Sequence, residues 1–312
     1  MRIAVMGSGA VGGYFGAKLA AAGHELAFVA RGQHLQALCK RGLRIVSPNG
    51  NLHISNVLFT DDPAKIGAVD VILFCVKSYD TAAAARQIEP LVADRTVILS
   101  LQNGVDNSEK LARIYRPQQV LPAVVYIGAQ LTAPGIITHS NGGQIIFGQI
   151  DGRTSESSKL LQQSLSAAGI PCEISGEIAK IQWTKLLWNA PFCAISCLAR
   201  ANVKEIVESE SLTALALGCM TEVQAAAGKR DIELRRAQFD EIMNFSRTLG
   251  DFKPSMLQDL EAGKPLEYQA FNGIVMRTLR SVGVPAPINR MFCQTLEFID
   301  RRIRSRLKSK ET

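Results

Sequence analysis

The sequence contains no apolar run long enough to cross a lipid bilayer. A membrane-spanning helix needs about 20 consecutive apolar residues, whereas the most hydrophobic stretch, residues 71–76, has the length of a β-strand. The N-terminal segment MRIAVMGSGAVGG is interrupted by glycines too early to form the apolar core of a signal peptide. These absences predict a cytoplasmic protein that does not bind membranes.

Paired cysteines and metal-ligand spacings are also absent. The seven cysteines are scattered with no C-x-x-C pair, and the four histidines include no H-x-x-x-H. Such cysteines are typical of reduced, mostly buried thiols in a cytosolic protein rather than of a disulfide framework. The histidine spacing predicts no metal site.

Most of the excess positive charge lies at the end of the chain. The net charge is +7, but residues 301–312 hold six basic residues and one acidic residue, which together contribute +5. The rest of the chain is nearly neutral and lacks the basic, aromatic-bearing surface that nucleic-acid binding usually needs. We therefore expect no nucleic-acid partner. We interpret the tail as a solvated helix end, where cations also suit the helix dipole.

A change of pattern near residue 176 divides the chain. Before it, short apolar runs rich in β-branched residues alternate with helical patterns, which predicts βαβ units and a mostly parallel sheet. The predicted strands are residues 3–6, 26–30, 71–76, 97–101 and 120–127, and two further short strands are punctuated by Gly135, Gly142, Gly143 and Gly148. After it, helical periodicity predicts helices at residues 178–198, 203–227, 234–249, 266–282 and 288–307. The expected fold class is α/β, with a Rossmann-type dinucleotide-binding domain at residues 1–175 and an all-α domain at residues 176–312.

The first predicted strand leads directly into a glycine-rich loop that matches G-x-G-x-x-G and opens a helix. Gly7 would permit the tight turn, Gly9 the close approach of a pyrophosphate and Gly12 the close contact of helix and strand. The predicted cofactor contacts comprise the whole loop: Gly7, Ser8, Gly9, Ala10, Val11 and Gly12. The alternative is a glycine-rich turn without a ligand.

Three further residues follow predicted strands, where open α/β sheets bind ligands. Arg31 stands where an NAD-specific site usually has Asp or Glu, and a guanidinium can instead pair with a 2′-phosphate, which favours NADPH. Lys77 and Asn103 follow the third and fourth long strands, and we expect both to project into the cofactor cleft. An exposed strand-end arginine and two turn or cap residues are the alternatives.

Polar side chains also interrupt apolar patterns in the helical half. In the segment QWTKLLWNAPFC, Lys185 and Asn189 lie four residues apart and share one helix face, which Cys193 continues. Glu267 and Ser255 are further candidates there. A first-turn acid for Glu267 and an N-cap for Ser255 are the alternative roles that their positions allow.

With these motifs, the chain resembles the ketopantoate reductase (2-dehydropantoate 2-reductase) family over nearly its whole length. The resemblance is carried by GSGAVGGYFG, by VKSYD and LQNGVDN after two strands, by WTKLLWN, and by PSMLQDLEAGKPLEYQAFNG. The opening glycines are shared by many dehydrogenases, whereas the later motifs in this order are far more specific.

The resemblance implies that Lys185 is the catalytic lysine and Glu267 its carboxylate partner. It assigns substrate binding to Asn103, Asn189 and Ser255, and NADPH binding to the glycine-rich loop, Arg31, Lys77 and Asn103. The implied reaction is the NADPH-dependent reduction of a small 2-oxo acid, ketopantoate, to pantoate, on the way to pantothenate and coenzyme A.

One position departs from the family pattern. Ketopantoate reductases commonly carry a second asparagine one helical turn after the first, followed by a proline, but here Cys193 takes that position and the proline comes earlier, at Pro191. Because a thiol is a weak hydrogen-bonding group, the identity of the 2-oxo acid stays open. The alternatives are a paralogous reductase of another 2-oxo acid or a related carbonyl or imine, and a non-catalytic NADP(H)-binding regulator. The oligomeric state also stays open, with a homodimer as one candidate.

Overall fold

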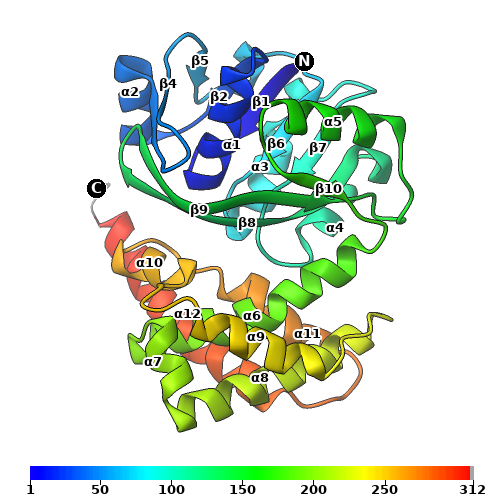
Figure 1. Ribbon diagram of the computed structural model, residues 1–312, viewed down its shortest axis with the longest axis vertical. Coiled ribbons are helices and arrows are strands. Elements are labelled where there is room, and N and C mark those ends of the chain that lie inside the picture. Colours follow the sequence, from blue (N-terminus) through cyan, green and yellow to red (C-terminus); the bar gives the residue numbers. More distant parts are fainter. Residues whose placement is uncertain (310–312) are drawn as a thin grey trace. The chain divides into compact units, whose positions relative to one another are not determined.

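The computed structural model describes residues 1–309 of the chain. The chain divides into two compact units, Met1–Ile178 and Ala179–Thr312. The first unit combines a sheet with helices, and the described part of the second unit is helical (Figure 1). This confirms the predicted α/β class and the all-α character of the second half.

A mixed sheet forms the centre of the first unit, in the strand order β4-β3-β9-β8-β7-β6-β1-β2-β5, with β10 beside β9. Its strands are β1 (Arg2–Met6), β2 (Glu25–Val29), β3 (Leu43–Val46), β4 (Leu52–Ile54), β5 (Leu58–Thr60), β6 (Val71–Phe74), β7 (Val97–Ser100), β8 (Val120–Ala133), β9 (Ile136–Phe147) and β10 (Cys172–Ile174). The neighbours from β5 through β2, β1, β6 and β7 to the start of β8 pair in parallel. Their carboxyl ends therefore meet at one edge of the sheet.

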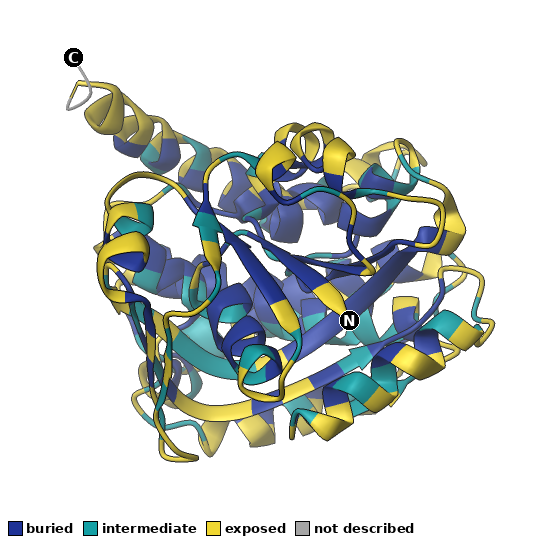
Figure 2. Cartoon of the chain, turned by 90° about the horizontal axis from the view of Figure 1, so that it is seen from above, coloured by how far each residue is buried: buried dark blue, intermediate teal, exposed yellow. Residues whose placement is uncertain are grey.

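Helices cover both faces of this sheet. They are α1 (Ala10–Ala21), α2 (Gly32–Arg41), α3 (Thr81–Gln87), α4 (Asn107–Ala112) and α5 (Glu156–Ala167), with short turns η1 (Pro63–Lys65), η2 (Ser78–Asp80), η3 (Glu89–Leu91) and η4 (Pro117–Gln119). Alternate residues of β1 enter different cores: Ile3 and Val5 pack in the core that contains α1 and α5, Ala4 and Met6 in the core that contains α3 and α4. Figure 2 shows the strands largely in the dark blue of buried residues. Burial on both faces explains why these strands are apolar throughout.

The prediction of two short strands around Gly142 and Gly143 is wrong. A single twelve-residue strand, β9, pairs antiparallel with β8 instead. Both glycines have positive φ, and the register shifts beside them, between Tyr126 and Ile127. The glycines therefore form a bulge that bends a continuous ladder rather than ending it.

The second unit consists of α6 (Ile178–Ala199), α7 (Val203–Glu208), α8 (Glu210–Gly228), α9 (Ala237–Arg247), α10 (Ser255–Glu261), the π-helical turn η5 (Gln269–Gly273), α11 (Ile274–Arg280) and α12 (Pro287–Lys308). The single helix predicted at residues 203–227 is wrong, because the chain breaks at Ser209. The hydroxyl of Ser209 accepts a hydrogen bond from the Leu212 N–H and so caps a new helix, α8.

The basic tail continues α12 with mostly exposed cations, as interpreted from the sequence. Lys310, Glu311 and Thr312, which also belong to that tail, lie outside the described residues. Within residues 1–309, no helix has both the length and the apolar character that crossing a membrane requires.

Candidate active site

The glycine-rich loop between β1 and α1 is held tightly by the neighbouring strand. Gly7 has a φ of 97°, and a Cβ there would lie 2.9 Å from the Val76 backbone nitrogen. The Gly7 and Ser8 N–H groups and the Ser8 hydroxyl all donate to the Val29 carbonyl oxygen. A Cβ at Gly12 would overlap the Gly7 carbonyl oxygen. Gly7 and Gly12 therefore serve the turn itself.

Gly9 differs from these two glycines. A Cβ placed there would meet no atom within 4 Å, so packing within the protein does not require a glycine. Gly9 is also the N-cap of α1, and no side chain caps that helix end. Open space therefore lies in front of the uncapped N–H groups, at the positive end of the helix dipole. This arrangement suits the pyrophosphate of a dinucleotide. The loop thus fits the predicted cofactor.

Arg31 lies at the carboxyl end of β2, next to the neighbouring β1 loop in the sheet order. Its guanidinium is largely exposed and lies 3.5 Å from a carboxylate oxygen of Asp80. Surface ion pairs of this length contribute little free energy. Arg31 can therefore turn toward an anionic group such as a 2′-phosphate without a large loss.

Lys77 and Asn103 follow β6 and β7, which are adjacent parallel strands. The loop after β7 is tied to the loop after β6 by Gln102, whose side-chain amide donates to the Val76 carbonyl (2.9 Å) and to the Thr81 hydroxyl (2.7 Å). Asn103 and Lys77 are both half-buried. The structure thus brings Lys77 and Asn103 to the same sheet edge as the glycine-rich loop and Arg31.

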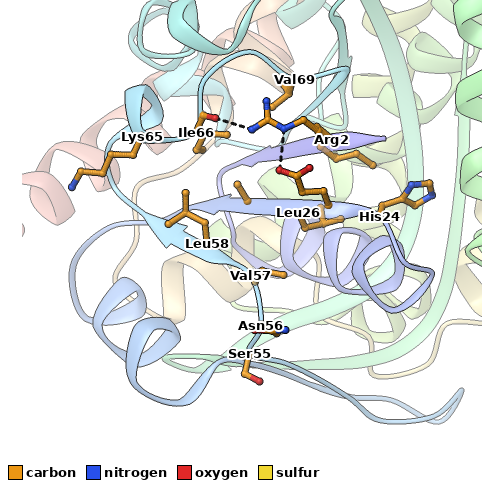
Figure 3. A pocket seen from close by; sticks show the side chains of 13 residues that line it. Arg2, His24, Leu26, Ser55, Asn56, Val57, Leu58, Lys65, Ile66 and Val69 are labelled. Carbon is orange, nitrogen blue, oxygen red and sulfur yellow. Dashed lines mark hydrogen bonds and ion pairs between the residues drawn. The ribbon is translucent and has the colours of Figure 1, made fainter.

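A pocket of about 470 Å³ lies at the opposite edge of the sheet, where β1 and β2 begin (Figure 3). Arg2 lies across it and donates hydrogen bonds to Glu25 and to the Ile66 carbonyl oxygen. His24 and Lys65 also contribute to its walls. Because it adjoins the amino ends of the parallel strands, it is not part of the predicted cofactor site.

In the second unit, α6 carries Lys185, Asn189 and Cys193 at four-residue intervals on one face. Lys185 is half-buried, while Asn189 is 6% exposed and Cys193 fully buried. Trp183 on the same helix is buried, and Trp188 donates from its indole N–H to the Ser246 hydroxyl (3.1 Å). An ammonium and an amide are therefore held among large apolar side chains, as the sequence predicts.

Burial has a direct electrostatic effect on Lys185. Loss of solvation lowers the pKa of its ammonium from 10.5 to about 8, while electrostatic interactions with Cys193 and Glu267 act in the opposite direction. Glu267 is only 4% exposed. The structure thus brings Lys185 and Glu267 into electrostatic contact although they are far apart in the sequence. A lysine with a pKa near neutrality can both donate and recover a proton.

The segment that carries Glu267 is anchored from α12. The Leu266 N–H donates to a carboxylate oxygen of the buried Asp300 (2.8 Å), and the other oxygen of Asp300 accepts from Arg304 (2.6 Å). Two residues after Glu267, the chain enters the π-helical turn η5. Such turns occur frequently at functional sites.

Ser255 is half-buried at the first position of α10, and Pro254 is the N-cap. No side chain caps this helix, so the alternative role of Ser255 as an N-cap is wrong. Its assignment to the substrate stays a prediction.

None of the seven cysteines, all of which lie within residues 1–309, forms a disulfide, and four of them, Cys193, Cys197, Cys219 and Cys293, are buried. Burial raises the pKa of the Cys197 thiol, and the nearby Cys193 adds to that shift. Among residues 1–309, no three His, Cys, Asp or Glu side chains gather as metal ligands would.

Sequence patterns do not identify two groups of buried polar residues. Gln102 joins the loops after β6 and β7, as described above. In the helical unit, Asn272, Asn289 and Glu222 form a connected set of hydrogen bonds beside α6. The only local signal was their polarity within apolar surroundings, because their partners are distant in the sequence.

Comparison with known proteins agrees with these motifs. Residues 3–152 match the family model for ketopantoate reductase PanE/ApbA, and residues 177–300 match the model for its C-terminal part. The chain is 33% identical to a 2-dehydropantoate 2-reductase of Mesorhizobium japonicum, over 92% of this chain and 94% of that protein.

Solved structures agree as well. A PanE/ApbA family ketopantoate reductase from Ralstonia eutropha superposes with a TM-score of 0.91 at 32% identity, covering 97% of this chain and all of that one. A D-mandelate dehydrogenase in a ternary structure with NADH and anilino(oxo)acetate has a TM-score of 0.90, with 97% and 99% covered, but only 20% identity, and so shows the fold alone. The chain therefore belongs to the ketopantoate reductase family, an oxidoreductase family, as its motifs predict.

Proposed function

We propose that this chain is an NADPH-dependent 2-dehydropantoate 2-reductase that reduces ketopantoate to pantoate. The observation that carries the proposal is the half-buried Lys185 of α6, which shares a helix face with Asn189 and interacts with the buried carboxylate of Glu267. Membership of the family supports the reaction class. The choice of ketopantoate rests on the names of relatives such as the Mesorhizobium japonicum protein.

NADPH supplies the hydride for this reaction when it is bound. The chain's own contribution at that end is to bind and orient the cofactor. The N–H groups around Gly9 would hold the pyrophosphate and Arg31 the 2′-phosphate. Lys77 and Asn103, at the neighbouring strand ends, would lie beside the nicotinamide, with Asn103 also reaching the substrate.

Lys185 would act on the oxygen of the substrate ketone. Reduction of the carbonyl carbon builds negative charge on this oxygen, which the ammonium can stabilise before donating its proton from Nζ. Glu267 keeps Lys185 in the charged form despite burial, since its carboxylate raises the lysine pKa. Asn189 and Ser255 would hold the carboxylate or hydroxyl of the substrate through their amide and hydroxyl groups.

A paralogous reductase of another 2-oxo acid remains the second candidate, because one observation favours it. Cys193 is fully buried one turn beyond Asn189, where the family commonly has an asparagine. One hydrogen bond to the substrate would then be missing. A non-catalytic regulator is less well supported, since both Lys185 and Glu267 are present.

The function is tested by following NADPH oxidation with purified protein and a panel of 2-oxo acids that includes ketopantoate. We expect saturable turnover in which ketopantoate has the highest kcat/KM. Preference for another member would move the assignment to the paralogous reductase, and no turnover with any member would contradict the reductase proposal altogether.

Replacement of Cys193 with asparagine tests the substrate assignment further. We expect Cys193→Asn to raise kcat/KM for ketopantoate, relative to an otherwise identical 2-oxo acid without the hydroxyl group, by about 10- to 100-fold. The physical reason is that an amide can bond the hydroxyl group and a thiol can do so only weakly. The measurement is the ratio of the two kcat/KM values.

Cys197→Asn is the matched control, since Cys197 is equally buried one turn farther along α6. Its ratio should stay within about twofold of the wild-type ratio, whatever its effect on stability. An unchanged ratio in Cys193→Asn, or an equal change in both variants, would show that Cys193 does not face the substrate hydroxyl.

The cytoplasmic location, the absence of a nucleic-acid partner and the homodimer stay predictions from the sequence. A small 2-oxo acid is the partner that the proposed reaction requires.

A further inference from the structure

Asn272 lies inside the π-helical turn η5, five residues after Glu267, and is fully buried. Its side-chain amide donates to the Ala190 carbonyl oxygen of α6 at 2.9 Å and to Oδ1 of Asn289 at 3.0 Å. Ala190 adjoins Asn189, the candidate substrate ligand. Asn272 therefore joins the helix that carries Lys185 directly to the segment that carries Glu267.

The bond to Ala190 lies next to the point where α6 lacks a backbone hydrogen bond. Pro191 lies within this helix, and a proline has no N–H to donate to the carbonyl four residues earlier. A helix interrupted in this way can bend. A hydrogen bond from Asn272 to the residue just before the proline holds the backbone at that point.

Asn272 is itself held in place by further hydrogen bonds through Asn289. Asn289 donates from Nδ2 to a carboxylate oxygen of Glu222 in α8 (2.7 Å), and the same carboxylate accepts the Ile288 and Asn289 N–H groups at the start of α12. A carboxylate at a helix N-terminus is electrostatically favourable. The chain of bonds thus links α8, α12, η5 and α6, and fixes the direction of the Asn272 amide.

One atom of this network is left unsatisfied. Within residues 1–309, Oδ1 of Asn272 is a buried side-chain oxygen without a hydrogen-bond partner. An unpaired buried acceptor lowers stability, and an apolar side chain of the same shape would avoid that loss. What the asparagine contributes here is therefore its donor group, which bonds Ala190 and Asn289.

We propose that Asn272 is a positioning residue for the reduction, which sets the placement of the Lys185 helix relative to the Glu267 segment through its bond to Ala190. This inference rests on the proposed function, because it assigns Asn272 a part in the same reaction. It acts through Lys185 and Glu267 and not on the substrate.

The test replaces Asn272 with leucine, which has a similar shape but no donor. We expect kcat to fall by about 10- to 100-fold, since a misplacement of about 1 Å at a catalytic group can have such an effect. KM for NADPH should stay within about twofold, because the proposed cofactor contacts lie elsewhere. Cys193 and Glu267 both act to raise the pKa of Lys185 against the effect of burial. Loosening of the Glu267 segment should therefore move the alkaline limb of the pH–rate profile to lower pH.

Ile206→Ala is the structural control. Ile206 is fully buried in α7 and its side chain, having no polar atom, cannot join the network, so its truncation should lower the melting temperature while kcat stays within about threefold. A kcat of Asn272→Leu within threefold of the wild type would overturn the proposal. An equal fall in kcat in Ile206→Ala, at the same loss of melting temperature, would also overturn it. If the leucine variant does not fold, Asn272→Ser, whose shorter side chain does not reach Ala190, is held to the same outcomes.

A separate readout distinguishes failure of this inference from failure of the proposed function. If the wild type reduces no 2-oxo acid, the pH at which Lys185 is acetylated by acetic anhydride can be followed by mass spectrometry of its peptide. The midpoint should lie near pH 8 in the wild type and lower in Asn272→Leu. Equal midpoints would overturn the positioning role regardless of activity.

Discussion

Replacement of Lys185 with methionine is expected to reduce turnover of the 2-oxo acid by about 100- to 1,000-fold, the usual effect of removing a preorganised donor from an active site. Methionine keeps the length of the side chain but has neither positive charge nor proton. Binding of NADPH, followed by its fluorescence, should stay near the wild-type affinity, because the proposed contacts to the cofactor lie in the first unit. Near-normal turnover would contradict the role of Lys185.

The same substitution should stabilise the fold. At pH 7 Lys185 is charged in both states, and its folded pKa, about 8, lies below the unfolded value of 10.5. The charged form is therefore disfavoured in the folded protein at any pH below about 8, and this penalty disappears only as pH rises through both values. Allowing for partial exposure of the side chain, we expect Lys185→Met to raise the free energy of unfolding at pH 7 by about 1–2 kcal/mol. Urea unfolding measures this, and a decrease would contradict the assigned environment.

Gly9→Ala is expected to weaken NADPH binding by about 10- to 100-fold with an almost unchanged melting temperature. Its methyl group would enter the open space into which no protein atom projects, so the fold should accept it, whereas a pyrophosphate approaching the N–H groups would collide with it. The loss corresponds to about one hydrogen bond to a charged group. Titration of NADPH and thermal unfolding provide the two measurements.

Gly12→Ala is the matched variant in the same loop. Here the new methyl group would overlap the Gly7 carbonyl oxygen and crowd Val5 and Cys75, so stability should fall by about 1–3 kcal/mol or more. If Gly9→Ala binds NADPH as tightly as the wild type, the pyrophosphate does not lie in this open space. If it instead unfolds as readily as Gly12→Ala, its glycine serves the turn and not the cofactor.

The elements that could be predicted from the sequence are those with strong local patterns. The buried strands β1, β2, β6 and β7 are continuous apolar runs, and α6 has a long apolar periodicity that its proline does not end. Short strands near the sheet edges, such as β3, β4 and β5, have three or four residues each and give no clear period. The sequence does not predict the bulge at Gly142, because a glycine pair that ends a strand and one that bends it look alike in sequence.

In the candidate site, too, the sequence predicts the relations that depend on local spacing but not those that depend on tertiary packing. The i, i+4 spacing of Lys185 and Asn189 places them on one face by helix geometry alone. The pairing of Lys185 with Glu267 depends on how α6 packs against a segment far along the chain, and only the family resemblance indicated it. Asn272, Asn289 and Asp300 could not be found at all, because each is defined by partners that tertiary packing brings to it.

The pH dependence of kcat/KM for the best 2-oxo acid tests the central claim most directly, because it reports the ionisation of the free enzyme. Lys185 must be protonated to stabilise and protonate the ketone oxygen. Activity should therefore be full below its pKa of about 8 and fall tenfold per pH unit above it, and the residual activity of Lys185→Met should lack this limb. A profile that stays flat to pH 10, or a limb that persists in Lys185→Met, would contradict the account.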